Sequence, residues 1–273
     1  MPFLTACTSI LGFVVNPRHL LVTGIGLAVF LAFIFSVIRQ YAATRVFMRL
    51  LRPDRDRDAT ETLRSALAEL EIQEKMVSVI DSADLLCFCA GLLRPRMYIS
   101  RGALQALSRE ELVAVLAHEY HHLRKWDPLR SAFLRALKNA LFFIPVVHYL
   151  ERRHEVAKEV SADAEAMRRG QGKLVLASAL YKLSGTRHSG IPVLAPFADC
   201  KVLETRISFL AGRGLIPVTL TPKAFGASLV VIAAFFLLAV HPSRAEAPPQ
   251  EPCRSGEAGW AILVAPTGAG YRP

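Results

Sequence analysis

The chemically distinctive stretch of this chain is His118-Glu119-Tyr120-His121-His122, which matches the pattern H-E-x-x-H. On a helix, His118 and His122 lie one turn apart on the same face, so both imidazoles can bind one metal ion. Glu119 lies beside them, where it can take a proton from water. Two imidazoles, a third protein ligand and an open position are typical of hydrolytic zinc centres. The pattern therefore predicts a zinc site.

The residues around this stretch favour a helix that places the histidines on a buried face. Ser108–Glu111 reads as a capping box, which predicts that the helix begins near Arg109. Asp127-Pro128 is expected to end this helix and to cap the next one. A surface helix with scattered histidines would not explain the apolar stripe that leads into them, formed by Leu112, Val115 and Leu116.

A second predicted helix, residues 151–169, offers the third ligand. Glu159 and Asp163 lie one turn apart on one face of it. We expect Glu159 to bind the metal and Asp163 to orient an imidazole. Glu155, one turn earlier, is the competing candidate for the third ligand. His154 is expected on the surface or at the membrane edge rather than at the metal.

The composition indicates membrane spans. Hydrophobic residues make up 52% of the chain, and the net charge is +10. Leu20–Ile38 contains no charged residue and would be about 28 Å long as a helix, enough to cross a bilayer core. Only Arg18 precedes it, whereas six arginines follow within residues 39–57. By the positive-inside rule, the N-terminus is outside and the following residues are cytoplasmic.

A second charge-free run, Ala224–Val240, would be about 26 Å long and predicts a second span. It gives the same orientation as the first span, because basic residues precede it: Lys201, Arg206, Arg213 and Lys223. The tail, residues 241–273, is rich in Pro, Ala and Gly and is expected to be disordered outside the membrane. Because the positive charge is mostly juxtamembrane and no recognition motif is present, direct nucleic-acid binding is not expected.

Between the spans we expect helices at residues 59–71 and 102–107 and a small sheet. Its strands are predicted at residues 76–80, 85–89 and 97–100, packed on the metal-binding helix. If one strand is an edge beside the site, it could bind an extended peptide by strand addition. Cys87 and Cys89 alternate on one strand face and are interpreted as small apolar residues rather than ligands.

Residues 131–150 contain another apolar cluster, Leu141–Val147, which Pro145 interrupts. A single crossing here would put Glu159 on the opposite side of the membrane from the histidines. Residues 123–158 are too few for two crossings and a turn. We therefore expect a helix that is buried in the domain or lies against the membrane.

These patterns predict a mainly α membrane protein. Two transmembrane helices flank a cytoplasmic α+β, zincin-like metallopeptidase domain with a small β-sheet. The expected order is an N-terminal apolar segment at 1–19, a span at 20–38, the cytoplasmic zinc peptidase domain at 39–223, a span at 224–240 and the tail at 241–273.

Several residue blocks, in this order and spacing, resemble the BlaR/MecR-type family of integral-membrane zinc metallopeptidases. HtpX-like and CAAX prenyl peptidases are more distantly similar. The blocks are Gly91-Leu92-Leu93-Arg94-Pro95-Arg96, Leu107-Ser108-x-Glu110-Glu111-Leu112, His118-Glu119-x-x-His122-x-Arg124-Lys125-x-Asp127, Phe142-Phe143-x-Pro145 and Glu159-x-x-Ala162-Asp163.

The resemblance implies a gluzincin site of the form HExxH…ExxxD. His118, His122 and Glu159 would bind one Zn²⁺ per chain, Glu119 would be the catalytic base, and Asp163 would support the site. The implied function is a membrane-anchored zinc metalloendopeptidase of the inner membrane that takes part in regulated proteolysis and signalling. Its expected substrate is a protein or peptide, with a transcriptional repressor and a membrane protein as the candidates.

The chain also departs from this family. Its best-known members have more spans before the domain and a large antibiotic-sensing domain outside the membrane. Here one clear span precedes the domain, and the tail is residues 241–273, so the resemblance does not extend to antibiotic sensing. The alternative function is a membrane signalling scaffold whose peptidase domain binds a partner without cutting it.

Overall fold

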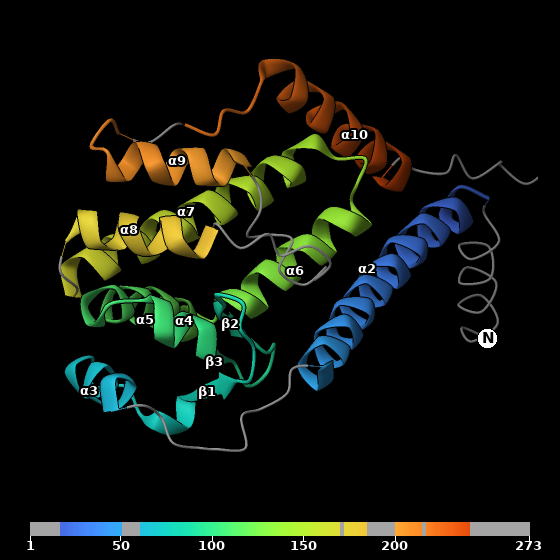
Figure 1. Cartoon of the computed structure of the whole chain (residues 1–273). Coiled ribbons are helices and arrows are strands. Elements are labelled where there is room, and N and C mark those ends of the chain that lie inside the picture. Colours follow the sequence, from blue (N-terminus) through green and yellow to red (C-terminus); the bar gives the residue numbers. More distant parts are fainter. Residues whose placement is uncertain (1–16, 51–60, 170–171, 185–199, 215–216, 241–273) are drawn as a thin grey trace, which may run out of the picture. The chain divides into compact units, whose positions relative to one another are not determined.

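The computed structural model describes residues 17–50, 61–169, 172–184, 200–214 and 217–240. This part of the chain is mostly helical and contains a small mixed sheet (Figure 1). Two predictions fall outside these ranges: the part of the apolar segment before residue 17 and the tail at 241–273.

Among the described residues, two helices are long and apolar enough to cross a membrane, α2 (Pro17–Leu50) and α10 (Pro222–Val240). The apolar side chains of both are largely exposed. Helix α2 does not end at Ile38, where its charge-free run stops, but continues for three more turns. Residues 39–50 contain no Gly or Pro that would break a helix. In this extension Phe47 is buried against Phe88 of the sheet, with ring centroids 5.7 Å apart.

The sheet has three strands in the order β1-β3-β2: β1 (Val77–Ile80), β2 (Cys87–Ala90) and β3 (Arg96–Ser100). Strand β1 is parallel to β3, and β2 is antiparallel to it. In the described part of the chain β2 pairs only with β3, so it is an edge strand. The β2–β3 turn requires glycine, because Gly91 has φ +108° and a Cβ there would lie 2.6 Å from the carbonyl oxygen of Arg94. Helix α3 (Glu61–Glu69) and a short 3₁₀ turn (Glu74–Met76) precede the sheet.

The central helix is α5 (Arg109–Lys125), which follows the short helix α4 (Arg101–Ala106). The predicted capping box is present: Ser108 accepts from the N–H of Glu111, and the Glu111 carboxylate accepts from the N–H of Ser108. Helix α5 ends at Trp126, which has the left-handed conformation. Its apolar face packs on α3, the sheet and α8 (Lys173–Ser184), burying Leu112, Val113 and Leu116.

Residues 131–150, where a helix buried in the domain or against the membrane was expected, belong to two helices and the turn between them. Helix α6 (Asp127–Ala140) ends before the apolar cluster, a turn occupies residues 141–144, and Pro145 is the first residue of α7 (Pro145–Arg169). Proline suits this position because the first N–H of a helix has no intrahelical partner. The two helices form a hairpin (Figure 1). Helix α9 (Cys200–Leu210) then packs on α7.

Candidate metal centre

Three potential metal ligands converge between α5 and α7. The Nε2 atoms of His118 and His122 lie 3.1 Å apart. Glu159 faces both imidazoles, with Oε2 3.5 Å from His118 Nε2 and Oε1 3.7 Å from His122 Nε2. All three residues are buried, and their ligand atoms lie within 4.8 Å of one another. The structure thus brings together the two histidines and the third residue that the sequence put forward.

The other nitrogen of each imidazole lies next to a carboxylate, and at His122 a hydrogen bond orients the ring. Nδ1 of His118 lies 3.0 Å from Asp163 Oδ1, one turn beyond Glu159 on α7. Nδ1 of His122 is hydrogen-bonded to Asp127 Oδ2 at 2.8 Å. A carboxylate on Nδ1 leaves Nε2 free to bind a metal. Asp163 therefore lies where the sequence placed it.

Asp127 has a different position from the predicted one. It is the first residue of α6 and not its N-cap, which is Trp126, and its carboxylate bonds to His122. The left-handed residue Trp126 turns the chain back at the end of α5, which carries Asp127 toward His122 five residues earlier. The contact could have been predicted from the sequence, because an acidic residue lies five positions after the second histidine.

Arg206 on α9 is a member of the centre that sequence reasoning missed. Its guanidinium donates two hydrogen bonds to Asp163, at 2.7 and 2.9 Å, and its Nη1 lies 3.2 Å from Glu159 Oε2. In the sequence, Arg206 is one of the basic residues that precede the second charge-free run. Nothing near it in the sequence indicates burial, because its acidic partners are more than forty residues away.

The charges of the centre are strongly coupled. Burial acts to lower the pKa of His118, but the neighbouring Asp163 and Glu159 outweigh it and raise this pKa to about 9. Burial acts to raise the pKa of Glu159, but the imidazoles and Arg206 hold it well below its usual range. Without a metal, a proton is therefore held among the ligands, and Glu159 is ionised. A divalent cation could replace that proton, because metal ligands must be deprotonated.

Glu119 is buried next to the ligands but is not one of them. Its Oε2 atom makes no hydrogen bond among the described residues. Burial raises the pKa of Glu119 above the usual range of a carboxyl, although the imidazoles of His122 and His118 act against this. An elevated pKa makes this carboxylate a stronger base, which suits it to accept a proton from water.

The competing candidates lie elsewhere. Glu155 forms an ion pair with Lys158 at 2.5 Å and lies 4.0 Å from Arg135, outside the ligand group. His121 faces Ser161 across the α5–α7 surface, with 3.1 Å between Nε2 and Oγ. His154 is half-buried rather than on the surface as expected, and it is not one of the three converging residues.

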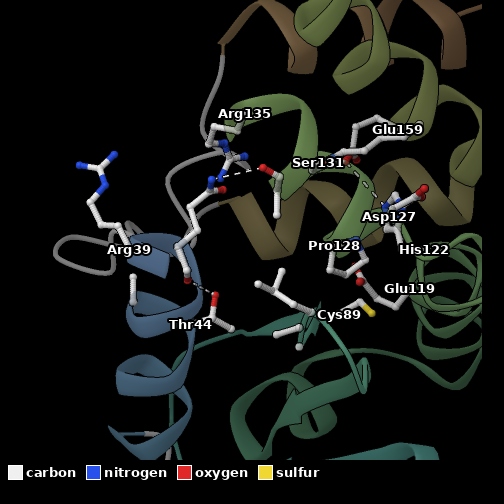
Figure 2. Close-up of a pocket in the computed structure, with 17 residues that line it drawn as sticks. Arg39, Thr44, Cys89, Glu119, His122, Asp127, Pro128, Ser131, Arg135 and Glu159 are labelled. Carbon is white, nitrogen blue, oxygen red and sulfur yellow. Dashed lines mark hydrogen bonds and ion pairs between the residues drawn. The ribbon is translucent and has the colours of Figure 1, made fainter. Parts of the chain in front are cut away.

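A pocket of about 450 Å³ opens beside the centre (Figure 2). Glu119, His122 and Glu159 lie along one side, and the extension of α2 forms another with residues such as Thr44. Cys89 and Ala90 of the edge strand β2 also line it. The pocket is thus bounded by the candidate base, two candidate ligands, a strand edge and the continuation of the first apolar helix.

The donor set fits zinc. Two imidazole nitrogens and one carboxylate, with space on one side, form the three-ligand arrangement of catalytic zinc sites. The Oε2 atom of Glu159 is buried and makes no hydrogen bond among the described residues, although Arg206 Nη1 lies 3.2 Å away. A buried oxygen of this kind needs a partner, and a cation between the ligands would supply one.

A family model described as BlaR1 peptidase M56 matches residues 17–210. The chain belongs to this family. The match includes α2, both helices of the metal centre and α9 with Arg206, so the M56 assignment covers every residue of the centre. It bears out the resemblance inferred from the residue blocks.

Curated relatives of this M56 chain have the names expected from the resemblance. It is 31% identical to a "Protease HtpX homolog" of Nitrosomonas eutropha over 97 residues, covering 34% of the chain and 33% of the relative. It is 31% identical to "Regulatory protein BlaR1" of Bacillus licheniformis over 86 residues, covering 32% and 14%. It is 29% identical to a "Protease HtpX homolog" of Streptococcus uberis over 128 residues, covering 44% and 43%. The aligned parts thus span less than half of each relative.

Proposed function

We propose that this chain is a membrane-anchored zinc metalloendopeptidase. The observation that carries this proposal is the convergence of His118, His122 and Glu159 beside the unpaired carboxylate of Glu119, at the wall of a pocket. The names of the HtpX-like relatives, which are proteases, support the same activity. The metal, one ion per chain, follows from the donor set.

In the proposed reaction, each residue has a defined task. A zinc ion held by His118, His122 and Glu159 would supply Lewis-acid polarisation of the scissile carbonyl and acidify water. Glu119 takes a proton from the attacking water on its free Oε2 and passes it to the leaving amine. Asp163 and Asp127 hold the two imidazoles with Nε2 toward the ion.

The substrate is proposed to bind as an extended strand on the free edge of β2. This strand lines the pocket with Cys89 and Ala90, and its outer edge has no partner strand among the described residues. Backbone groups of an edge strand can pair with any extended peptide, whatever its side chains. A site of this kind selects an unfolded or loosely folded segment rather than a small molecule.

The anchoring follows from α2 and α10, whose charge-free runs would lie in the inner membrane. Under the positive-inside rule, residues 39–223 form a cytoplasmic peptidase domain between two spans. Arg206 no longer supports this orientation, since it is buried in ion pairs, but Lys201, Arg213 and Lys223 still precede the charge-free run of α10. The six arginines within residues 39–57 remain the main argument.

A role in regulated proteolysis is also part of the proposal. Its support is the name of one relative, a regulatory protein, together with the position of the pocket against α2. A transcriptional repressor or a membrane protein is the proposed substrate class. Both could present an extended segment near the inner face of the membrane.

The direct test compares new protein termini in cells that carry the wild type or the Glu119→Gln variant. We expect the variant to retain zinc and to lose cleavage by about 100-fold or more, because general base catalysis typically contributes that much. Termini that appear only with the wild type would identify substrates. Stoichiometric zinc without cleavage by the wild-type chain would instead favour the non-cleaving signalling scaffold.

A further inference from the structure

The α6–α7 hairpin presents apolar side chains that the metal centre does not use. Residues 139–150, between Lys138 and Glu151, contain no Asp, Glu, Lys or Arg. At the turn, Phe142 is 71% exposed and Phe143 is 40% exposed. Two neighbouring exposed aromatic residues at the tip of a hairpin mark an interaction surface.

The contact of this hairpin with α2 indicates what covers the surface. The side-chain amide of Asn139 donates to Ser36 Oγ at 2.8 Å. Ser36 lies two residues inside the charge-free run that ends at Ile38, which is about 3 Å along the helix.

The contact with α10 gives the same depth independently. The backbone N–H of Val146 donates to Ser228 Oγ at 3.0 Å. Ser228 lies four residues inside the charge-free run that begins at Ala224, or about 6 Å along the helix. Ser228 is 2% exposed, although most of α10 is exposed. Two helices at opposite ends of the chain thus place the hairpin tip inside the apolar layer.

Several backbone N–H groups of the turn are paired, as that layer favours. Unpaired N–H groups are costly in hydrocarbon. The N–H groups of Leu141, Ile144 and Val147 bond to carbonyls within the hairpin, Val146 bonds to Ser228, and Pro145 has no N–H. Below the turn, Lys138 and Glu151 form an ion pair at 2.8 Å. The first charges on each arm of the hairpin therefore neutralise one another at its base.

We propose that the hairpin enters the hydrocarbon layer from the side of the domain as a re-entrant loop, with Phe142 and Phe143 in contact with lipid tails. Lipid is favoured over a second copy of the chain because exposed apolar residues of α2 at the same level, such as Phe35, must also meet lipid. The inference rests on the proposed anchoring by α2 and α10. It adds a third membrane contact, made by the segment that joins the two halves of the metal centre.

The test is spin labelling of the full chain in lipid nanodiscs at three positions with matched exposure in the structure. They are Phe142→Cys at the tip (71%), Phe35→Cys in the proposed span (67%) and Leu93→Cys in the β2–β3 turn (68%). Each variant is made in a chain with three cysteines replaced by Ala. These are Cys7, Cys200 and Cys253, whereas Cys87 and Cys89 stay because burial raises the pKa of their thiols.

We expect the labels at Phe142 and Phe35 to be relaxed severalfold more by oxygen than by a water-soluble nickel chelate, and the label at Leu93 to show the reverse. A Phe142 label that behaves like Leu93 would overturn the re-entrant loop while leaving the anchoring intact. Protection of the Phe142 label from both reagents would show a protein partner and would also overturn it. Water access at Phe35 would instead refute the anchoring itself.

A second measurement tests the same inference if a spin-labelled variant does not fold. Phe142→Trp, made with Trp126→Phe and Trp260→Phe, places one tryptophan at the tip. We expect its fluorescence to be quenched by brominated lipid tails. Leu93→Trp in the same background should not be quenched, and equal quenching at the two positions would overturn the inference.

Discussion

At the residue scale, the centre depends on buried acidic groups whose charge Arg206 helps to neutralise. Asp163 is fully buried and Glu159 is 5% exposed, and the Arg206 side chain bonds one and lies next to the other. Removing one partner of a buried ion pair leaves an uncompensated charge, which is far more costly than losing a surface pair. Arg206 thus holds both the metal ligand and the carboxylate that orients His118.

Arg206→Leu should therefore weaken both the fold and zinc binding. We expect a loss of about 3–5 kcal/mol in stability, as for other broken buried pairs, and a 10–100-fold loss in zinc affinity, as for groups that orient ligands. The measurements are thermal unfolding in detergent and zinc competition with a chelator. Arg168→Leu is the matched control, since Arg168 is exposed and pairs with Glu165 on the surface. Equal effects of the two substitutions would contradict this role.

The pH dependence of the metal-free protein follows from His118. Its pKa is raised to about 9 in the fold, above the usual 6.5. The stability that its protonated form contributes is therefore fully present below pH 6.5 and is lost as pH rises through 9. We expect the midpoint of thermal unfolding of the metal-free chain to fall over that range, and the zinc-loaded chain not to show this fall. A metal-free midpoint that rises from pH 6.5 to 9 would be incompatible with a protonated His118.

At the scale of elements, the edge strand β2 makes a prediction about substrates. In an extended peptide, alternate N–H groups point toward the neighbouring strand. Methylating single backbone nitrogens of a cleaved peptide should block cleavage at every second position near the scissile bond and be tolerated at the others. Cleavage rates of such a peptide series would show this period of two. A uniform response to methylation would argue against binding by strand addition.

The sequence predicted those elements whose signals are local. The capping box at Ser108, the apolar stripe and the H-E-x-x-H spacing all lie within one helix. The observed bounds of α5 agree with those that these signals predicted. The sequence did not predict the turn at 141–144, because an apolar run is compatible with both a helix and a hairpin tip. Arg206 was missed for a similar reason: burial of a charge is decided by partners that are distant in sequence.

At the scale of the whole molecule, the hairpin limits the distance between the site and the membrane. Glu159 lies eight residues after Glu151, the first charged residue of the second arm, which is about 12 Å along α7. If Glu151 lies at the membrane surface, the metal centre is close to it. Cleavage would then occur beside the membrane rather than far into the cytoplasm.

A substrate tethered to the same nanodisc should show this distance. We expect cleavage once about four or more extended residues separate the membrane anchor from the scissile bond, because each spans about 3.4 Å. Tethered peptides should also be cut faster than the same free peptide, through their higher effective concentration. A much longer threshold would indicate a site farther from the membrane, and the absence of any threshold would contradict this distance.

The central claim is that His118, His122 and Glu159 hold one catalytic zinc ion, and the zinc content of two purified variants tests it most directly. Glu159→Gln removes the proposed ligand, whereas Glu155→Gln removes an acid of the same type one turn earlier that pairs with Lys158. Metal analysis should find one zinc per chain in the wild type and in Glu155→Gln, and little in Glu159→Gln. Zinc retained by Glu159→Gln and lost by Glu155→Gln would contradict the account.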